Sequence, residues 1–253
     1  MKRLLITIVL IPLMMVSQTN ESLVIENIML TVKPDKIAEF EAGIAAHNKK
    51  FHATGPFGAR VYNIDNGKNA GKYMLIMGPL QWSALDGRPS SKEHSEDNNK
   101  NINQYLESSV EVNYMKMHPD LSNFSKDFEI NKVSVFMVDI KRFKDMDFMG
   151  KVVKKVVKMY KEKMPDQIYG IYTNEMPNMD GMDFAWVDFF DSYSWMAKDD
   201  TFMRDFEDVH GTGSFQQFMK DVEATTDGDK GEIWSLRKDL SGPDAKVIAL
   251  ERQ

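Results

Sequence analysis

Two polar side chains with rings, His47 and Tyr160, lie on the apolar stripes of two expected helices. The stripe of His47 also contains Phe40 and Ile44, at three- and four-residue steps. His52, five residues after His47, is expected to point away from this stripe. Because an imidazole titrates near neutral pH, a buried histidine could act as a general base on an acidic phenol or enol. The alternative is that both rings mark the margin of an ordinary core.

Other catalytic and metal-binding patterns are weak. The chain has no cysteine, which excludes thiol nucleophiles and disulfide bonds. It has no serine nucleophile elbow and no HExxH motif. His94 lies near Glu93, Glu96 and Asp97, which together could bind a metal ion weakly. This polar stretch is expected to be a solvated loop, so we predict no metal site and no cofactor.

The N-terminal segment is typical of a secretory signal peptide. Residues 1–18 begin with the basic pair Lys2 and Arg3 and continue with an apolar run over residues 4–16. A run of this length is too short to span a bilayer. We therefore expect a periplasmic or secreted protein that has no integral membrane segment once the signal is removed.

The charge of the chain argues against two classes of partner. Without Lys2 and Arg3, 30 basic residues remain against 38 acidic residues. A net negative protein is repelled by nucleic acid and by anionic membranes, so neither is expected as a partner. The hydrophobic content of 42% is enough for one large domain or two ordinary ones.

The pattern of apolar residues predicts one structural unit used twice. Expected elements of the first unit are a strand at 23–32, a helix at 35–51, strands at 60–64 and 72–77, a long loop with a broken helical turn at 82–101, a short helix at 102–109 and a strand at 110–117. An offset of 113 residues pairs His47 with Tyr160 and Trp82 with Trp195. We predict a signal peptide at 1–18, a first unit at 23–118, a linker at 119–127, a second unit at 128–241 and a tail at 242–253.

Both units carry a tryptophan in the turn that follows their third strand, Gln81-Trp82-Ser83-Ala84-Leu85 and Tyr193-Ser194-Trp195-Met196-Ala197. With two β-α-β-β-α-β units, this arrangement resembles the dimeric α+β barrel superfamily of the antibiotic-biosynthesis-monooxygenase type, as a fused tandem. The resemblance implies an α+β fold in which two tandem ferredoxin-like units pack sheet to sheet as an intrachain α+β barrel. It covers nearly all of residues 23–241.

The same resemblance implies a pocket between the sheet and the helices of each unit, holding a small apolar or aromatic molecule. If the protein is an enzyme, the resemblance implies a cofactor-independent monooxygenase-like or isomerase-like reaction with His47 as its base. The implied ligand-binding residues are Tyr160, Trp82, Trp195, Arg60 and Tyr62. The alternative is a non-catalytic binding or interaction protein of the cell envelope that uses the barrel as a scaffold, as a monomer or homodimer.

Haem-degrading relatives in this superfamily suggest a second set of residues. Asn27, Trp195 and His210 occur in the order that such proteins use. Asn27, however, belongs to the other unit, and His210 directly precedes the helix break at Gly211-Thr212-Gly213. These departures argue against haem.

Overall fold

The computed structural model describes residues 21–88, 90–107, 110–176, 182–198 and 200–249. The predicted signal peptide, residues 1–18, lies outside the described residues. Within the described part of the chain, no helix is long and apolar enough to cross a membrane.

The first half of the chain alternates strands with helices in the predicted order. Pro34 begins a short 3₁₀ turn, a position at which a backbone N–H would have no partner within the helix. The helix that follows buries Phe40 and Ile44 against the sheet. Its elements are β1 (Leu23–Leu30), α1 (Ile37–Phe51), β2 (Ala59–Ile64), β3 (Tyr73–Gln81), α2 (Trp82–Asp86), α3 (Lys92–Asn101) and β4 (Glu111–Met117).

The second half repeats this order with more helix. A single π-helical turn, Met149–Val153, joins α4 to α5, and Gly211 and Gly213 separate α6 from α7, which confirms the predicted helix break. The elements are β5 (Phe128–Glu129), β6 (Lys132–Ile140), α4 (Asp145–Phe148), α5 (Lys154–Lys163), β7 (Tyr169–Asn174), β8 (Phe184–Phe190), α6 (Phe202–His210), α7 (Ser214–Thr225), β9 (Thr226–Leu236) and β10 (Lys246–Val247).

Eight strands form a closed antiparallel barrel in the order β1-β3-β2-β9-β6-β8-β7-β4. The two halves join at β2 with β9, where Tyr62 pairs with Leu236, and at β4 with β7, where Lys116 pairs with Thr173. Closure leaves none of these eight strands with an unpaired edge. The predicted α+β barrel of two ferredoxin-like units is therefore confirmed.

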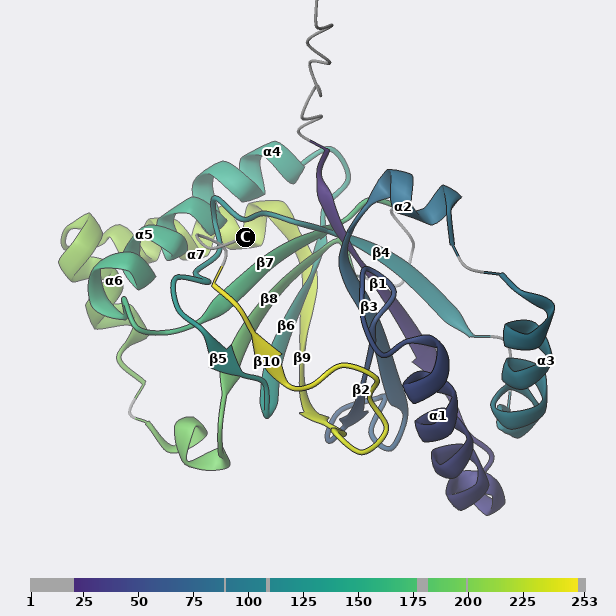
Figure 1. Cartoon of the computed structure of the whole chain (residues 1–253). Helices are drawn as coiled ribbons and strands as arrows, with labels where there is room; N and C mark the ends of the chain where they lie inside the picture. The colour runs from purple at the N-terminus through teal and green to yellow at the C-terminus, as the bar shows by residue number, and fades with distance from the viewer. Residues whose placement is uncertain (1–20, 89, 108–109, 177–181, 199, 250–253) are drawn as a thin grey trace, which may run out of the picture.

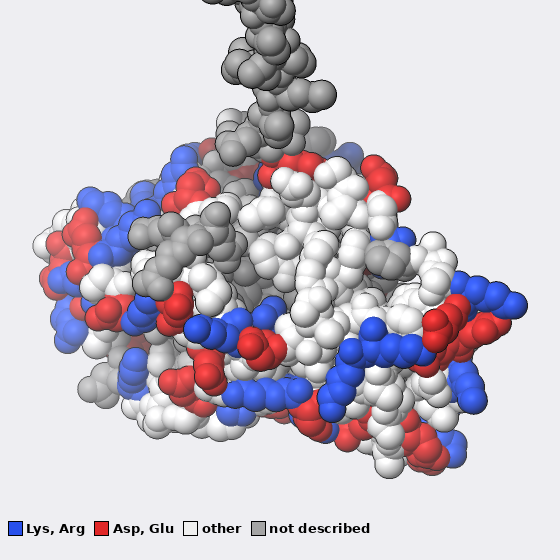
Figure 2. Space-filling view, viewed as in Figure 1, with Lys and Arg blue, Asp and Glu red and all other residues white. Residues whose placement is uncertain are grey.

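The helices cover the outside of the barrel in two separate groups. Figure 1 shows α1 and α3 on one flank and α4 to α7 on the other. On the face shown in Figure 2, basic and acidic side chains are interspersed, with no large area of one sign. Three regions can therefore hold buried side chains: the layer under α1 and α3, the barrel interior, and the layer under α4 to α7.

Helix α3 is the main departure from the predicted elements. The loop predicted for residues 82–101 is wrong, because α2 and α3 occupy most of it. The Ser91 side chain caps α3 by accepting a hydrogen bond from the His94 backbone N–H at 3.0 Å. No residue of α3 is fully buried, so the helix lacks the apolar stripe that periodicity detects.

The C-terminal segment returns to the first half of the chain. Arg237 forms an ion pair with Glu41 of α1 at 2.5 Å, and the Asn48 amide donates to the Leu240 carbonyl at 2.8 Å. Beyond these contacts β10 pairs with β5 in a small separate sheet. The described part of the predicted tail thus forms a structural element beside the barrel.

Candidate functional site

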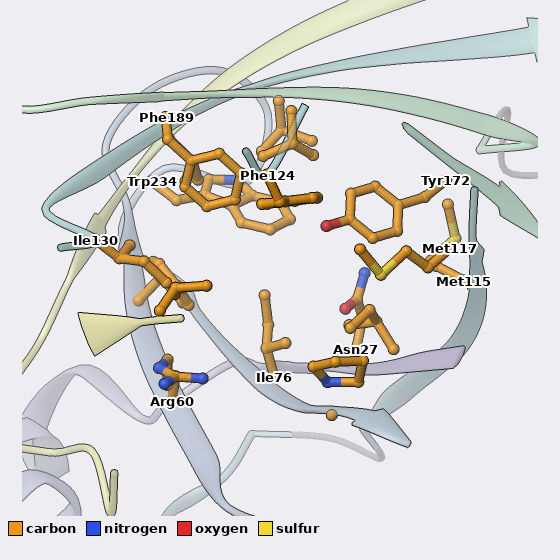
Figure 3. Close-up of a pocket in the computed structure, with 18 of the residues that line it drawn as sticks. Asn27, Arg60, Ile76, Met115, Met117, Phe124, Ile130, Tyr172, Phe189 and Trp234 are labelled. Atoms are coloured by element: carbon orange, nitrogen blue, oxygen red, sulfur yellow. The ribbon is translucent and has the colours of Figure 1, made fainter. Parts of the chain in front are cut away.

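The barrel interior contains a cavity of about 610 Å³. Side chains that point inward from strands of both halves line it, and most are apolar or aromatic (Figure 3). The volume lies in the range of roughly 300–1,000 Å³ that is typical of small-molecule sites. Representative lining residues are Ile76, Met115, Ala185, Phe189 and Trp234.

A few polar groups reach into this apolar cavity. The Oδ1 atom of Asn27 is buried and has no hydrogen-bond partner among the described residues. Figure 3 shows the hydroxyl of Tyr172 directed into the cavity. Gly170 lies beside that ring on β7, and a Cβ at this position would lie 2.6 Å from the Tyr172 hydroxyl. Glycine therefore permits the Tyr172 ring to lie close against its own strand.

The charged residues among those lining the cavity are both basic. Arg60 donates from Nε to the Asp244 carbonyl at 3.2 Å and from Nη2 to the Lys246 carbonyl at 3.4 Å. A guanidinium has five N–H donors, so others remain for a ligand. Lys246 itself also lines the cavity, and none of the described residues that line it is acidic. This end of the cavity is consequently electropositive.

The two tyrosines of the cavity are neutral at physiological pH. Burial raises the pKa of Tyr62 to about 12 and also raises the pKa of Tyr172. Both phenols therefore keep their protons and act as hydrogen-bond donors. Neither is suited to act as a base.

A second, smaller cavity of about 230 Å³ lies under α1 and α3. Its apolar wall comes from β1 and β3, including Leu30, Leu75 and Met77. Its polar wall contains His47, His52 and His94. This is the sheet-to-helix position at which a pocket was predicted.

The three histidines form a compact cluster. Each offers one ring nitrogen, and these three nitrogens all lie within 4.8 Å of one another. The two closest are Nε2 of His52 and Nε2 of His94, at 3.1 Å. His47 is 3% exposed, and its Nδ1 lies 2.7 Å from an Asp97 carboxylate oxygen. Such an arrangement of imidazoles could hold a metal ion.

The corresponding layer of the second half is filled with aromatic rings. Tyr160 packs against Trp186 at 4.7 Å between ring centroids and against Tyr169 at 5.2 Å. Among these rings, burial raises the pKa of Asp188 to about 7. Oδ1 of Asp188 and the Tyr169 hydroxyl have no hydrogen-bond partner among the described residues.

The predicted site residues are distributed over several places. Arg60 and Tyr62 line the barrel cavity, whereas His47 lines the smaller cavity. Trp82 packs against Tyr114 at 5.3 Å, and Trp195 stacks on Phe190 at 5.0 Å. Tyr160 belongs to the aromatic layer. Their functional roles remain predictions, and the structure does not bring them together in one pocket.

Sequence reasoning missed His52 and misjudged His94. The expectation that His52 points away from His47 is wrong, since the two ring centroids are 5.3 Å apart. His52 is the C-cap residue of α1 and has left helical geometry, so helical periodicity does not apply to it. For His94 the available signal was Ser91, a preferred N-cap residue three positions earlier.

The residues considered for haem do not share a cavity. Asn27 lines the barrel interior, and Trp195 stacks on Phe190. His210 packs against Phe206 at 4.4 Å and lies 3.0 Å from the Lys155 carbonyl through its Nε2. These three residues therefore do not fit a haem site.

Comparison with known proteins identifies the fold. No family model matches the sequence, and no curated protein matches it. A proposed monooxygenase from Lactobacillus acidophilus NCFM matches with a TM-score of 0.53 at 12% identity, covering 90% of this chain and 99% of that chain. An anthrone oxidase-like protein matches with a TM-score of 0.52 at 10% identity, covering 93% and 96%.

Chlorite dismutase from Candidatus Nitrospira defluvii, in complex with imidazole, matches with a TM-score of 0.52 at 8% identity. This match covers 88% of the present chain and 95% of the dismutase. At such low identities the likeness concerns the fold alone. The chain therefore has the fold of the dimeric α+β barrel proteins.

Proposed function

We propose that the protein binds a small molecule with an apolar or aromatic body and an anionic group inside the barrel. The observation that carries this proposal is the cavity of about 610 Å³, whose walls are apolar and whose two charged lining residues are basic. Burial of apolar ligand surface supplies affinity at roughly 25 cal/mol per Å² before the costs of association. The few polar groups supply orientation.

The polar groups of the cavity come from both halves of the chain. Asn27 on β1 has an unsatisfied amide oxygen, and Tyr172 on β7 carries a protonated hydroxyl. A ligand with a hydroxyl or amide donor would satisfy Asn27, and one with a carbonyl would accept from Tyr172. Arg60 would pair with a carboxylate, sulfonate or phosphate. Binding would thus require the closed barrel rather than either half.

The cavity favours binding over acid–base chemistry. Among the described residues of its lining there is no histidine and no carboxylate, and its tyrosines are protonated. The monooxygenase-like or isomerase-like reaction with His47 as base would have to take place in the smaller cavity. A role as a binding protein therefore requires fewer assumptions. The proposed monooxygenase and the anthrone oxidase-like protein among the fold relatives keep the enzymatic alternative open to test.

Two further parts of the proposal concern origin and location. The strand order is β4-β1-β3-β2 in the first half and β9-β6-β8-β7 in the second, and corresponding strands occupy corresponding places. This agreement supports a fused tandem of one unit. The N-terminal pattern of residues 1–18 supports export to the periplasm or beyond. Fractionation of the native host would test the location.

Fluorescence titration with anilinonaphthalene sulfonate tests the ligand site, because this probe has an aromatic body and one anionic group. Ala185→Trp fills the cavity and should weaken binding by at least about tenfold, or 1.4 kcal/mol. Ala42→Trp, on the exposed face of α1, is the matched control and should bind as the unaltered protein does. Equal binding by the Ala185→Trp protein would refute the barrel site.

The charge preference needs a second pair of variants. Arg60→Met should weaken binding of the same probe by about tenfold, because it removes a charge-assisted contact. Lys92→Met removes a side chain that is 88% exposed on α3 and should leave binding unchanged. Val187→Phe is a smaller cavity-filling change, to be used if the Ala185→Trp protein does not fold. Native mass spectrometry of protein from its own host would then identify the natural ligand.

A further inference from the structure

We propose that His47, His52 and His94 bind a divalent transition-metal ion at the cavity under α1 and α3. Zinc is the ion that we expect. This site is separate from the barrel cavity and does not depend on its ligand. Imidazole nitrogens suit zinc, whose bonds to them are about 2.0–2.1 Å long. Two such ligands in a tetrahedral site are about 3.3 Å apart, close to the 3.1 Å between His52 and His94.

The hydrogen bond of His52 fixes which of its nitrogens is free. Nδ1 of His52 lies 2.8 Å from the Phe57 carbonyl oxygen, which can only accept. Nδ1 therefore carries the proton, and in the neutral ring Nε2 is left with a lone pair. That lone pair is directed at His94. A backbone carbonyl orienting a histidine in this way is typical of metal-binding histidines.

His47 is oriented by a carboxylate in the same manner. Its Nδ1 lies 2.7 Å from Oδ1 of Asp97, so Nδ1 donates and Nε2 is the nitrogen available to an ion. A carboxylate, a histidine and a metal ion in series is a recurrent arrangement in zinc sites.

The third ring completes a set of converging nitrogens. Nε2 of His94 lies 3.1 Å from Nε2 of His52. His94 must therefore either donate a proton to the lone pair of His52 or bind the same cation as His52 does. An ion would satisfy all three rings at once. Drawing the nitrogens together requires side-chain shifts on the order of 1 Å.

Two helices hold the ligands in place. His47 lies on α1, His52 caps its C-terminus, and His94 lies in the first turn of α3. The helices can approach closely because residue 43 of α1 is a glycine and has no Cβ. A Cβ on Gly43 would lie 2.0 Å from the carbonyl oxygen of Asn101. Any larger residue at position 43 would push α3 away. The same contact thus sets the position of His94.

The site leaves one coordination position open. Three protein ligands with a fourth position for water or substrate are typical of catalytic rather than structural zinc. The three histidines all line the cavity of about 230 Å³, so a water molecule or substrate in that cavity could occupy the fourth position. Arg88 also lines this cavity, and its charge is balanced by an ion pair with the buried Glu26. An ion at this place would give the smaller cavity a reactive or ligand-binding centre that the protein side chains alone do not supply.

Metal binding can be measured directly on protein purified without a polyhistidine tag. Isothermal titration with zinc should give one ion per chain, and His94→Gln should weaken binding by at least about 100-fold. Asp97→Asn, which alters only the orienting carboxylate, should weaken binding by about 10- to 100-fold. His118→Gln is the matched control, because His118 lies outside the cluster and pairs with Thr173. It should bind zinc as the unaltered protein does.

Cobalt provides a second readout that does not depend on affinity. Visible absorption of the cobalt form should show the intense bands of a tetrahedral site, and His52→Gln should abolish them. At a zinc concentration of 100 times the dissociation constant, urea unfolding should show stabilisation by about 2.7 kcal/mol. The proposal is overturned if zinc does not bind at micromolar concentration. It is equally overturned if His94→Gln and His118→Gln bind alike while circular dichroism shows both folded.

Discussion

The helix layers on the two flanks of the barrel differ in what lies between helix and sheet. Under α1 and α3 a cluster of buried apolar residues that includes Phe40 and Ile44 leaves beside it a cavity of about 230 Å³ with three histidines in its wall. Under α4 to α7 the space is filled by a cluster of buried apolar residues that includes Val157, Tyr169, Trp186 and Phe206. His47 and Tyr160 occupy corresponding helices, yet one faces a cavity and the other packs between aromatic rings.

This difference shows that one fold can place a tightly packed core in one layer and a cavity for a ligand or an ion in another. A filled layer maximises buried apolar area and dispersion contacts, and each large buried side chain contributes about 1.5–3 kcal/mol. A hollow layer gives up some of that free energy and gains room for a ligand or an ion. We therefore expect the second flank to dominate the free energy of unfolding and the first flank to hold the metal ion, whereas the small molecule binds in the barrel between them.

The largest effect is expected from truncation in the filled layer. Phe206 is fully buried and contacts Phe218 at 4.6 Å between ring centroids. Phe206→Ala should lower the free energy of unfolding by about 3–5 kcal/mol through lost transfer energy and an internal cavity. Phe51→Ala, in the hollow layer, removes a half-buried ring that already borders empty space and should cost about 1–2 kcal/mol. Urea unfolding measures both, and equal losses would contradict the contrast.

The buried carboxyl of the filled layer should make stability depend on pH. The native pKa of Asp188 is about 7, above its ordinary value of 3.8, because the side chain is buried. The folded state therefore holds a proton that the unfolded state loses, and stability falls as the pH rises from about 4 through 7. Asp188→Asn removes this penalty and should stabilise the protein at pH 8 by on the order of 4 kcal/mol.

The control for this pH effect is the same comparison in acid. At pH 4 the Asp188 carboxyl is protonated in the folded protein and about half ionised in the unfolded chain, so the difference in unfolding free energy should fall to about 0.6 kcal/mol. A gain from Asp188→Asn that is equal at pH 4 and pH 8 would mean that hydrogen bonding or packing, and not ionisation, is responsible.

Local sequence patterns predicted the elements far better than the cavities. The strand predicted at 60–64 corresponds to β2, Ala59–Ile64, because its apolar residues lie between clear turn signals. The barrel cavity depends on pairing of β2 with β9 and of β4 with β7, between residues far apart in the chain. A local sequence pattern does not show which strands pair when they lie far apart in the chain. Arg60 and Tyr62 could be chosen as ligand residues, but Asn27 and Tyr172 could not be placed opposite them.

The histidine cluster escaped prediction for a different physical reason. His52 lies just beyond the end of α1, where the helical period no longer describes side-chain direction. His94 lies on a helix that buries none of its residues, so its polar sequence resembled a loop. The close approach of α1 and α3 involves Gly43, because a Cβ there would lie 2.0 Å from the Asn101 carbonyl oxygen. A sequence pattern can show that Gly43 is present, but it does not show what approaches it.

A smaller effect is expected where α1 meets α3. Gly43→Ala places a methyl group against the Asn101 carbonyl and should destabilise the protein by about 1–3 kcal/mol through overpacking. It should also weaken zinc binding, because His94 moves with α3. Gly150→Ala is the matched control, since a Cβ there meets no atom within 4 Å. Unfolding in urea and zinc titration measure the two effects, and unchanged zinc affinity would separate the helix contact from the metal site.

The smallest effect is expected at the ion pair that also bridges these two helices. Nζ of Lys50 lies 2.6 Å from Oε1 of Glu93, but the side chains are 49% and 70% exposed. Water screens such a pair, so Glu93→Gln should not measurably change the urea midpoint and should alter zinc affinity by less than about twofold. A loss of zinc affinity equal to that of Gly43→Ala would assign the position of α3 to the surface pair. The expected result instead assigns the position of α3 to backbone packing at Gly43, which holds α3 against α1 beside the cavity.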